Sequence, residues 1–127
     1  MPYSILIVDD SPMIRRLLRF CFERSTEWRV CGEAENGRIA IEKVEELHPD
    51  IVILDFQMPV MNGIEAAREI TRLTPHPALV MFTMHDCEQL RDEAQAAGIQ
   101  DVVSKSDRFA ERLIASLRNV SASPSAA

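Results

Sequence analysis

The sequence predicts an α/β domain in which helices cover both faces of a parallel β-sheet. Short apolar runs alternate with amphipathic helical patterns, and five strand–helix pairs follow one another along the chain. The runs are apolar without alternation, which is typical of strands buried on both faces of a parallel sheet. The repeated strand–helix order implies right-handed crossovers, with helices on both sides of the sheet.

Five segments have the composition of β-strands. Four of them are short apolar runs, namely Ile5–Val8, Ile51–Leu54, Ala78–Phe82 and Val102–Val103. The other segment, Trp28–Ala34, is more polar. We therefore expect it to lie nearer an edge of the sheet.

Helices are predicted after each strand from apolar residues at helical spacing. The first helix follows Ser11 and Pro12, which are a favourable N-cap and first-turn pair. The predicted inner faces are Ile14, Leu17, Leu18, Cys21 and Phe22 in the first helix, Ala40, Ile41, Val44 and Leu47 in the second, Ile64, Ala67 and Ile70 in the third, and Phe109, Leu113, Ile114 and Leu117 in the fifth.

The fourth helix, predicted over residues 87–97, has little apolar surface for its length. Its inner face consists of Cys87, Leu90, Ala94 and Ala97. Gly98 is placed to end the helix, because glycine readily adopts the left-handed conformation at that position. Since so little apolar surface is buried, we expect this helix to be the most loosely held of the five.

Composition and charge argue against several classes of function. The chain has 127 residues, of which 46% are hydrophobic and 27% charged, as is ordinary for one globular domain. The formal net charge of −6 argues against direct binding of nucleic acid or an anionic membrane, since phosphate contacts need a basic surface. No apolar run approaches the ~20 residues of a membrane span, and the first run lacks the basic segment of a signal peptide.

The cysteines and the C-terminal segment complete this organisation. Cys21, Cys31 and Cys87 are odd in number and widely spaced, which fits neither a disulfide framework nor a zinc site. We expect them to be small apolar residues of a protein in the reducing cytoplasm. The small residues of SASPSAA predict that a domain of residues 1–120 is followed, over 121–127, by a disordered tail or the start of a linker.

Polar residues follow four of the predicted strands at the point where each strand ends. Asp9 and Asp10 come after the first strand, Asp55 after the third, Thr83 after the fourth and Lys105 after the fifth. Ligands of open α/β sheets bind beyond the carboxyl ends of the strands. We therefore expect these five side chains to converge on one site.

Each of these residues alone has an ordinary structural explanation. A carboxylate after a strand often caps the next helix, an aspartate before a loop forms turns, and a surface lysine is usually solvated. However, Ser11 already occupies the capping position, and Lys105 is one of two lysines in the chain. The occurrence of such residues at four strand ends favours a functional site.

Three clustered carboxylates and one ammonium would leave a local formal charge of about −2, which needs compensation. A hard divalent cation would supply it, and Mg²⁺ suits a site of carboxylates, a carbonyl and waters. Mg²⁺ beside a carboxylate, a lysine and a hydroxyl is typical of phosphoryl transfer. The metal and the lysine neutralise phosphoryl oxygens, the carboxylate attacks phosphorus, and the hydroxyl donates to the product.

The sequence resembles the receiver domain of bacterial two-component response regulators over residues 3–119. The resemblance rests on ILIVDDSPMIRRLL, DIVILDFQMPVMNGIEAAREI and DVVSK, together with Thr83. The domain looks like a chemotaxis receiver, with some likeness to receivers joined to helix-turn-helix outputs. The resemblance implies a flavodoxin-like, doubly wound five-stranded sheet with strand order 2-1-3-4-5.

The resemblance also implies a role for each site residue. Asp55 would accept the phosphoryl group, Thr83 would move its hydroxyl onto that group, and Lys105 would be its ionic partner. Asp10 would bind Mg²⁺ directly, whereas Asp9 would act mainly through water. The implied Mg²⁺ ligands are therefore Asp9, Asp10, Asp55 and the main-chain carbonyl of Gln57.

As a receiver, the domain would be a signalling switch that is not itself an enzyme. A sensor histidine kinase or a phosphotransfer protein would phosphorylate it, and the fourth helix, fifth strand and fifth helix would form the face for an output partner or a phosphorylation-dependent homodimer. Two alternatives stay open. One is a Mg²⁺-dependent phosphohydrolase, whose usual D-x-D motif is DDS here, and the other is a receiver-like binding module that never sees phosphate.

Three residues depart from the family pattern. Val102 stands where the switch usually has an aromatic residue, which puts the threonine–aromatic coupling in doubt. Ser106 stands where proline usually follows the lysine, so we expect a trans bond after Lys105. His85 places an imidazole at a variable position that helps to set phosphoryl lifetime in the family.

Overall fold

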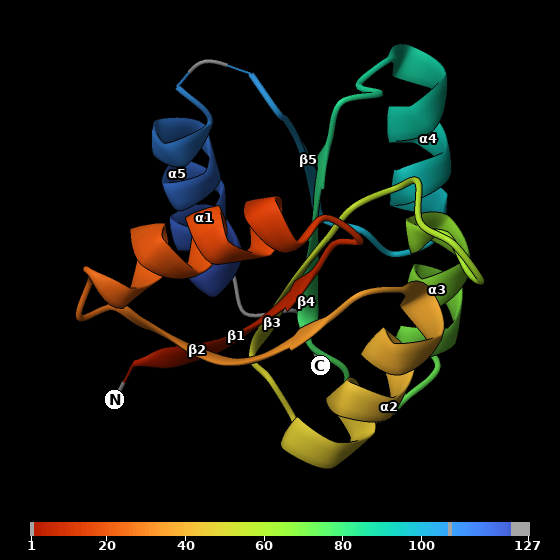
Figure 1. Ribbon diagram of the computed structural model, residues 1–127. Coiled ribbons are helices and arrows are strands. Elements are labelled where there is room, and N and C mark those ends of the chain that lie inside the picture. Colours follow the sequence, from red (N-terminus) through yellow and green to blue (C-terminus); the bar gives the residue numbers. More distant parts are fainter. Residues whose placement is uncertain (1, 107, 123–127) are drawn as a thin grey trace.

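A computed structural model describes residues 2–106 and 108–122, which form one five-stranded parallel sheet between two layers of helices (Figure 1). The strand order is β2-β1-β3-β4-β5, as predicted. The strands are β1 (Tyr3–Val8), β2 (Trp28–Ala34), β3 (Ile51–Leu54), β4 (Ala78–Thr83) and β5 (Asp101–Ser104). The helices are α1 (Pro12–Glu23), α2 (Gly37–Leu47), α3 (Gly63–Ile70), α4 (Glu88–Ala96) and α5 (Phe109–Ala122).

The sheet divides the apolar residues into two cores because successive strand residues point to opposite faces. In β1, Leu6 and Val8 pack with residues of α2, α3 and α4. Ile5 and Ile7 pack on the other face with residues of α1 and α5. Figure 1 shows α1 and α5 on one side of the sheet and the other three helices on the opposite side. The apolar runs are thus buried on both faces, which confirms the predicted fold class.

The ends of the helices follow their predicted signals where those signals were clear. Ser11 Oγ accepts a hydrogen bond from the Ile14 amide at 3.3 Å and caps α1. Gly98 has a φ of +96°, and the amide after it, that of Ile99, donates to the carbonyl of Ala94 at 2.9 Å. These bonds close the end of α4 in the manner of a glycine-terminated helix.

Two residues assigned to helix inner faces are exposed. Leu17 is 40% exposed because it sits at the margin of the apolar stripe of α1, whose buried residues are Leu18 and Phe22. Cys87 is exposed because α4 begins one residue later, which makes Cys87 its N-cap. Within α4, Leu90 and Ala94 alone are buried, so the small inner face is confirmed.

The C-terminal helix and the molecular surface complete the description. α5 continues through Ala122, two residues beyond the predicted boundary, and residues 123–127 of the predicted tail lie outside the described residues.

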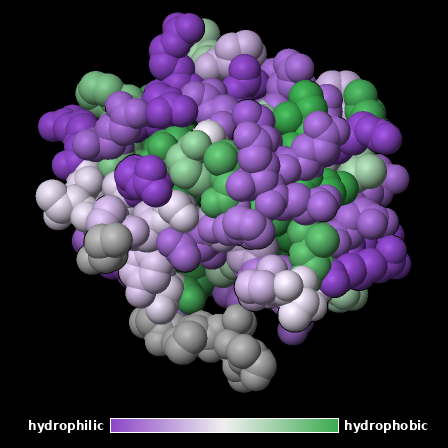
Figure 2. Space-filling model, turned by 90° about the horizontal axis from the view of Figure 1, so that it is seen from below, coloured by the Kyte–Doolittle hydropathy of each residue, from purple (hydrophilic) through white to green (hydrophobic). Residues whose placement is uncertain are grey.

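Figure 2 shows a face on which hydrophilic side chains predominate and apolar ones form small separate areas. None of the described helices has the length and apolar character needed to cross a membrane.

The loop between β3 and α3 contains a strained residue. Val60 has a φ of +71°, and the Met61 amide donates to the Pro59 carbonyl at 2.7 Å across it, which is the pattern of a γ-turn. A β-branched residue is disfavoured at positive φ. The end of the loop is held by a hydrogen bond from the Gly63 amide to the Phe56 carbonyl at 2.8 Å, and a Cβ at Gly63 would clash with the carbonyl oxygen of Asp55. This close approach explains the glycine and fixes the path of the loop.

We expect Val60→Gly to stabilise the domain by about 1 kcal/mol. Backbone strain of this kind costs roughly 1–3 kcal/mol, and glycine removes it. The greater freedom of glycine in the unfolded chain lowers this stabilisation by roughly 0.5–1 kcal/mol. Urea unfolding measures the difference. Val60→Ala is the matched control, because it shortens the exposed side chain but keeps the Cβ that causes the strain. Equal stability of the two variants would contradict the assignment.

Candidate functional site

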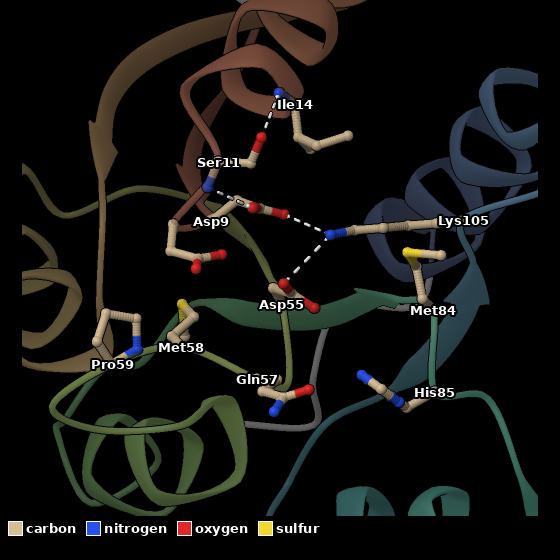
Figure 3. Close-up of a pocket in the computed structure, with 11 residues that line it drawn as sticks. Asp9, Ser11, Ile14, Asp55, Gln57, Met58, Pro59, Met84, His85 and Lys105 are labelled. Atoms are coloured by element: carbon tan, nitrogen blue, oxygen red, sulfur yellow. Dashed lines mark hydrogen bonds and ion pairs between the residues drawn. The ribbon is translucent and has the colours of Figure 1, made fainter.

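Three carboxylates converge at the carboxyl ends of β1 and β3. Ligand oxygens of Asp9, Asp10 and Asp55 all lie within 4.8 Å of one another. Asp9 and Asp55 are buried, whereas Asp10 is exposed. The Lys105 ammonium, which follows β5, lies 2.7 Å from Asp9 Oδ2 and 3.2 Å from Asp55 Oδ2 (Figure 3). The predicted convergence of these four residues is confirmed.

Backbone pairing between strands determines the spacing of these carboxylates. The amide of Asp9 donates to the Ala34 carbonyl at 3.0 Å, and the amide of Asp55 donates to the Val8 carbonyl at 3.0 Å. Both carboxylates also accept local hydrogen bonds. Asp9 Oδ1 accepts from the Ser11 amide at 2.9 Å, and Asp55 Oδ1 accepts from the Phe56 amide at 2.8 Å. Each carboxylate thus keeps its second oxygen for Lys105.

Burial is the largest influence on the pKa values of Asp55 and Lys105. Burial raises the pKa of Asp55, and the neighbouring Asp9 carboxylate raises it further, while Lys105 only partly offsets them. Burial alone would lower the pKa of Lys105, but its bonds to Asp9 and Asp55 outweigh burial and raise it. One ammonium therefore contacts the two buried carboxylates of a group of three. The donor set consists of hard oxygens in a net negative site, which fits Mg²⁺.

The remaining predicted residues differ in their access to this site. Gln57 lines the same open pocket, which has a volume of about 630 Å³, together with the carboxylates and Lys105. Thr83 ends β4 next to them but is fully buried, and its Oγ accepts a hydrogen bond from the His85 amide at 3.1 Å. The His85 ring lies edge-on to Phe56, with ring centroids 6.2 Å apart. The Thr83 hydroxyl therefore lies beneath residues 84–85, not on the pocket wall.

The sequence interpretation missed two features of the site. Part of the pocket wall is apolar, formed by Ile14, Met58, Pro59 and Met84. Arg15 Nη1 donates to the main-chain oxygen of Asp9 at 2.6 Å and so holds the loop that carries the acidic pair. The run DDSPMIRR contains two adjacent arginines, but nothing in their spacing indicates which one turns back onto the loop.

Comparison with known proteins identifies the family. The sequence matches the model of the response regulator receiver domain over residues 5–118. The chain belongs to this family. It is 40% identical over 101 residues to the chemotaxis protein CheY of Thermotoga maritima, an alignment that covers 80% of this chain and 83% of that protein. It is 39% identical over 112 residues to a protein-glutamate methylesterase/protein-glutamine glutaminase of Alkalilimnicola ehrlichii, of which the alignment covers 28%.

Solved structures of receiver domains have the same fold. The response regulator domain of Thermotoga maritima CheB superposes with a TM-score of 0.87 at 31% identity and covers 94% of this chain and 96% of that one. A LuxR-family response regulator from Aurantimonas sp. SI85-9A1 superposes with a TM-score of 0.88 at 32% identity, covering 96% and 87%. The domain is therefore a response regulator receiver of two-component signalling with a flavodoxin-like fold.

The bond after Lys105 also agrees with its prediction. Among the described residues, the cis peptide bond is Thr74–Pro75, and Lys105–Ser106 is trans. The Lys105 amide donates to the Thr83 carbonyl at 2.8 Å, so β4 and β5 remain paired up to the site. This pairing brings the ammonium to the carboxylates without a cis peptide bond directly after the lysine.

We expect Asp55→Asn to raise the stability of the metal-free receiver at neutral pH. A carboxyl whose pKa is higher in the folded than in the unfolded state stabilises the fold while protonated, and this contribution is lost as pH rises through the folded pKa. The amide carries no charge and avoids that loss. The gain should shrink as the pH falls through the raised pKa of Asp55.

Urea unfolding in the presence of a chelator, at several pH values between about 4 and 8, measures this effect. Asp92→Asn is the matched control, because Asp92 is an exposed carboxylate on α4. A pH-independent gain, or an equal gain in the control, would contradict the proposed cause.

Proposed function

We propose that this receiver is a phosphorylation-activated switch in which the Asp55 carboxylate accepts the phosphoryl group of a histidine kinase or phosphotransfer protein. The position of Asp55 carries the proposal. It ends the central strand β3 between the acidic pair and residues 84–85, and Lys105 points at it (Figure 3). A phosphoryl group on Asp55 would therefore lie beside Lys105 and the acidic pair.

Asp55, Lys105 and Thr83 would have separate roles in phosphoryl transfer. The Asp55 oxygen forms a bond to phosphorus while the phosphorus–nitrogen bond of a phosphohistidine donor breaks and leaves its electron pair on the imidazole. Lys105 holds a positive charge beside the new phosphoryl oxygens. The Thr83 hydroxyl still has a hydrogen to donate, because its present bond uses the oxygen as acceptor.

The acidic pair supplies the site for the cofactor. Mg²⁺ would be held by Asp9, Asp10, Asp55 and the main-chain carbonyl of Gln57. The three carboxylates are grouped closely enough to share one ion. When bound, the ion neutralises phosphoryl oxygens.

Family membership and the open pocket give no support to a phosphohydrolase, which needs a substrate enclosure. We propose residues 1–120 as the functional receiver.

The output face would be formed by α4, β5 and α5, for a partner protein or a second copy. Arg91 of α4 links two of these elements, α4 and β5. Its guanidinium donates to Asp86 Oδ1 at 2.7 Å and Asp86 Oδ2 at 2.8 Å, and to the Val102 carbonyl at 3.1 Å. One side chain thereby ties the loop after β4 to α4 and to β5. A change at Thr83 can reach this face through that connection.

We predict that acetyl phosphate and Mg²⁺ add one phosphoryl group to the receiver and that Asp55→Asn abolishes this. Intact-mass spectrometry measures the added phosphoryl mass, and a chelator should prevent it. Asp92→Asn again serves as the control, because it removes an exposed carboxylate away from the pocket. Unchanged labelling of Asp55→Asn would rule out the assigned acceptor.

We also predict that beryllofluoride, which stands in for the phosphoryl group, changes hydrogen exchange mainly in residues 83–97. A charge-assisted hydrogen bond from Thr83 is worth roughly 1.5–3 kcal/mol, which shifts a two-state equilibrium by about tenfold to a hundredfold or more. Thr83→Ala should remove most of the change. Changes confined to α1 and α2, with residues 83–97 unaffected, would be inconsistent with this output face.

A further inference from the structure

Arg15 connects the acidic pair to a neighbouring strand. From one guanidinium, Nη1 donates to the main-chain oxygen of Asp9 at 2.6 Å and Nε donates to Glu33 Oε1 of β2 at 3.0 Å. We propose that Arg15 is a positioning residue for the cation site, because it fixes the peptide group between Asp9 and Asp10. This inference rests on the proposed function, in which Asp10 is a direct Mg²⁺ ligand.

The two members of the acidic pair are held differently. Asp9 is 2% exposed, and its amide and both carboxylate oxygens have partners in Ala34, Ser11 and Lys105. Asp10 is exposed, and its carboxylate has no hydrogen-bond partner among the described residues. The direction of Asp10 therefore depends on the backbone that carries it.

The bond from Arg15 acts on that backbone directly. The carbonyl of Asp9 and the amide of Asp10 belong to one planar peptide group. Fixing the carbonyl oxygen therefore fixes the orientation of the peptide plane, which contains the Cα of Asp10. A short bond from a charged donor is a strong constraint of this kind.

Glu33 makes Arg15 a rigid anchor. Its second oxygen accepts from Arg19 Nε at 2.8 Å, so the carboxylate is held between two arginines of α1. Burial would raise the pKa of Glu33, but the hydrogen bonds from Arg19 and Arg15 outweigh burial and hold it below its usual value. Glu33 is thus ionised at neutral pH. It offsets the charge of Arg15, which can then lie beside a cation site with little repulsion.

The chemistry of this contact distinguishes arginine from lysine. Two diverging N–H groups of a planar guanidinium reach a carbonyl and a carboxylate at once, whereas the ammonium of lysine is a point charge on a flexible stem. If Arg15 acted through its charge alone, lysine would replace it fully. If it acts by holding the peptide group, lysine will not.

The test is Mg²⁺ affinity, measured by calorimetric titration for wild type, Arg15→Lys, Arg15→Gln and Arg16→Gln. Outer partners of metal ligands typically contribute ten- to a hundredfold in affinity, so we expect both Arg15 variants to bind Mg²⁺ about tenfold more weakly. Arg16 is an exposed neighbour on α1, and Arg16→Gln should bind like wild type. Thermal unfolding of each metal-free variant reports separately on any loss of stability.

Several outcomes would overturn the inference. Wild-type affinity in Arg15→Lys together with tighter binding in Arg15→Gln would show an effect of charge alone. Reduced stability with unchanged affinity would show a purely structural link between α1 and β2. If the Arg15 variants do not fold, Glu33→Gln decides the question. This substitution weakens the hold on Arg15 and keeps the size of the side chain at position 33. Unchanged affinity in that variant would equally refute the positioning role.

The same titration separates this inference from the proposed function. If the wild-type receiver binds no Mg²⁺ at all, the proposed function fails and the role of Arg15 falls with it. If the wild type binds Mg²⁺ and is phosphorylated but Arg15→Lys binds equally well, the inference alone fails.

Discussion

Three carboxylates held within 4.8 Å of one another are the constraint on which the rest of this receiver depends. The two buried ones, Asp9 and Asp55, are held in place because backbone hydrogen bonds tie Asp9 to β2 and Asp55 to β1. Burial removes the water that would otherwise screen their repulsion. Lys105 supplies one positive charge for this group, but burial and the Asp9 carboxylate still raise the pKa of Asp55. A site built in this way favours additional positive charge, whether a proton or a metal cation.

The fold tolerates this site because the sheet beneath it is buried on both faces. β1 and β3 contribute residues to both apolar cores directly behind the carboxylates, among them Val8 and Ile53. The strain at Val60 and the unfavourable ionisation of Asp55 both lie in loops at one end of the sheet. Apolar burial elsewhere offsets these local costs, a division typical of functional sites.

Local patterns and the geometry of a parallel sheet account for the features that the sequence predicted correctly. The strand ends at Asp9, Asp55 and Lys105 required only that strands be recognised, since a parallel sheet brings their carboxyl ends together. Periodicity misplaced Leu17 and Cys87. It gives the mean direction of a helix face, but it determines neither the margin of that face nor the residue at which the helix begins. The bond of Arg15 to the Asp9 carbonyl depends on Glu33, eighteen residues away on another strand. No spacing rule within α1 contains that information.

The valine at position 102 changes how a signal would leave the site. A valine has one stiff χ angle and cannot reproduce the swing of an aromatic ring. In this receiver the Thr83 oxygen accepts from the His85 amide, the next residue, Asp86, binds Arg91, and Arg91 binds the Val102 carbonyl. If Thr83 turns toward a phosphoryl group on Asp55, the His85 amide must find another acceptor. The loop that carries Asp86 would then shift, and Arg91 would transmit the shift to α4 and β5. Under the proposed function, a polar connection would therefore replace the ring as the coupling element.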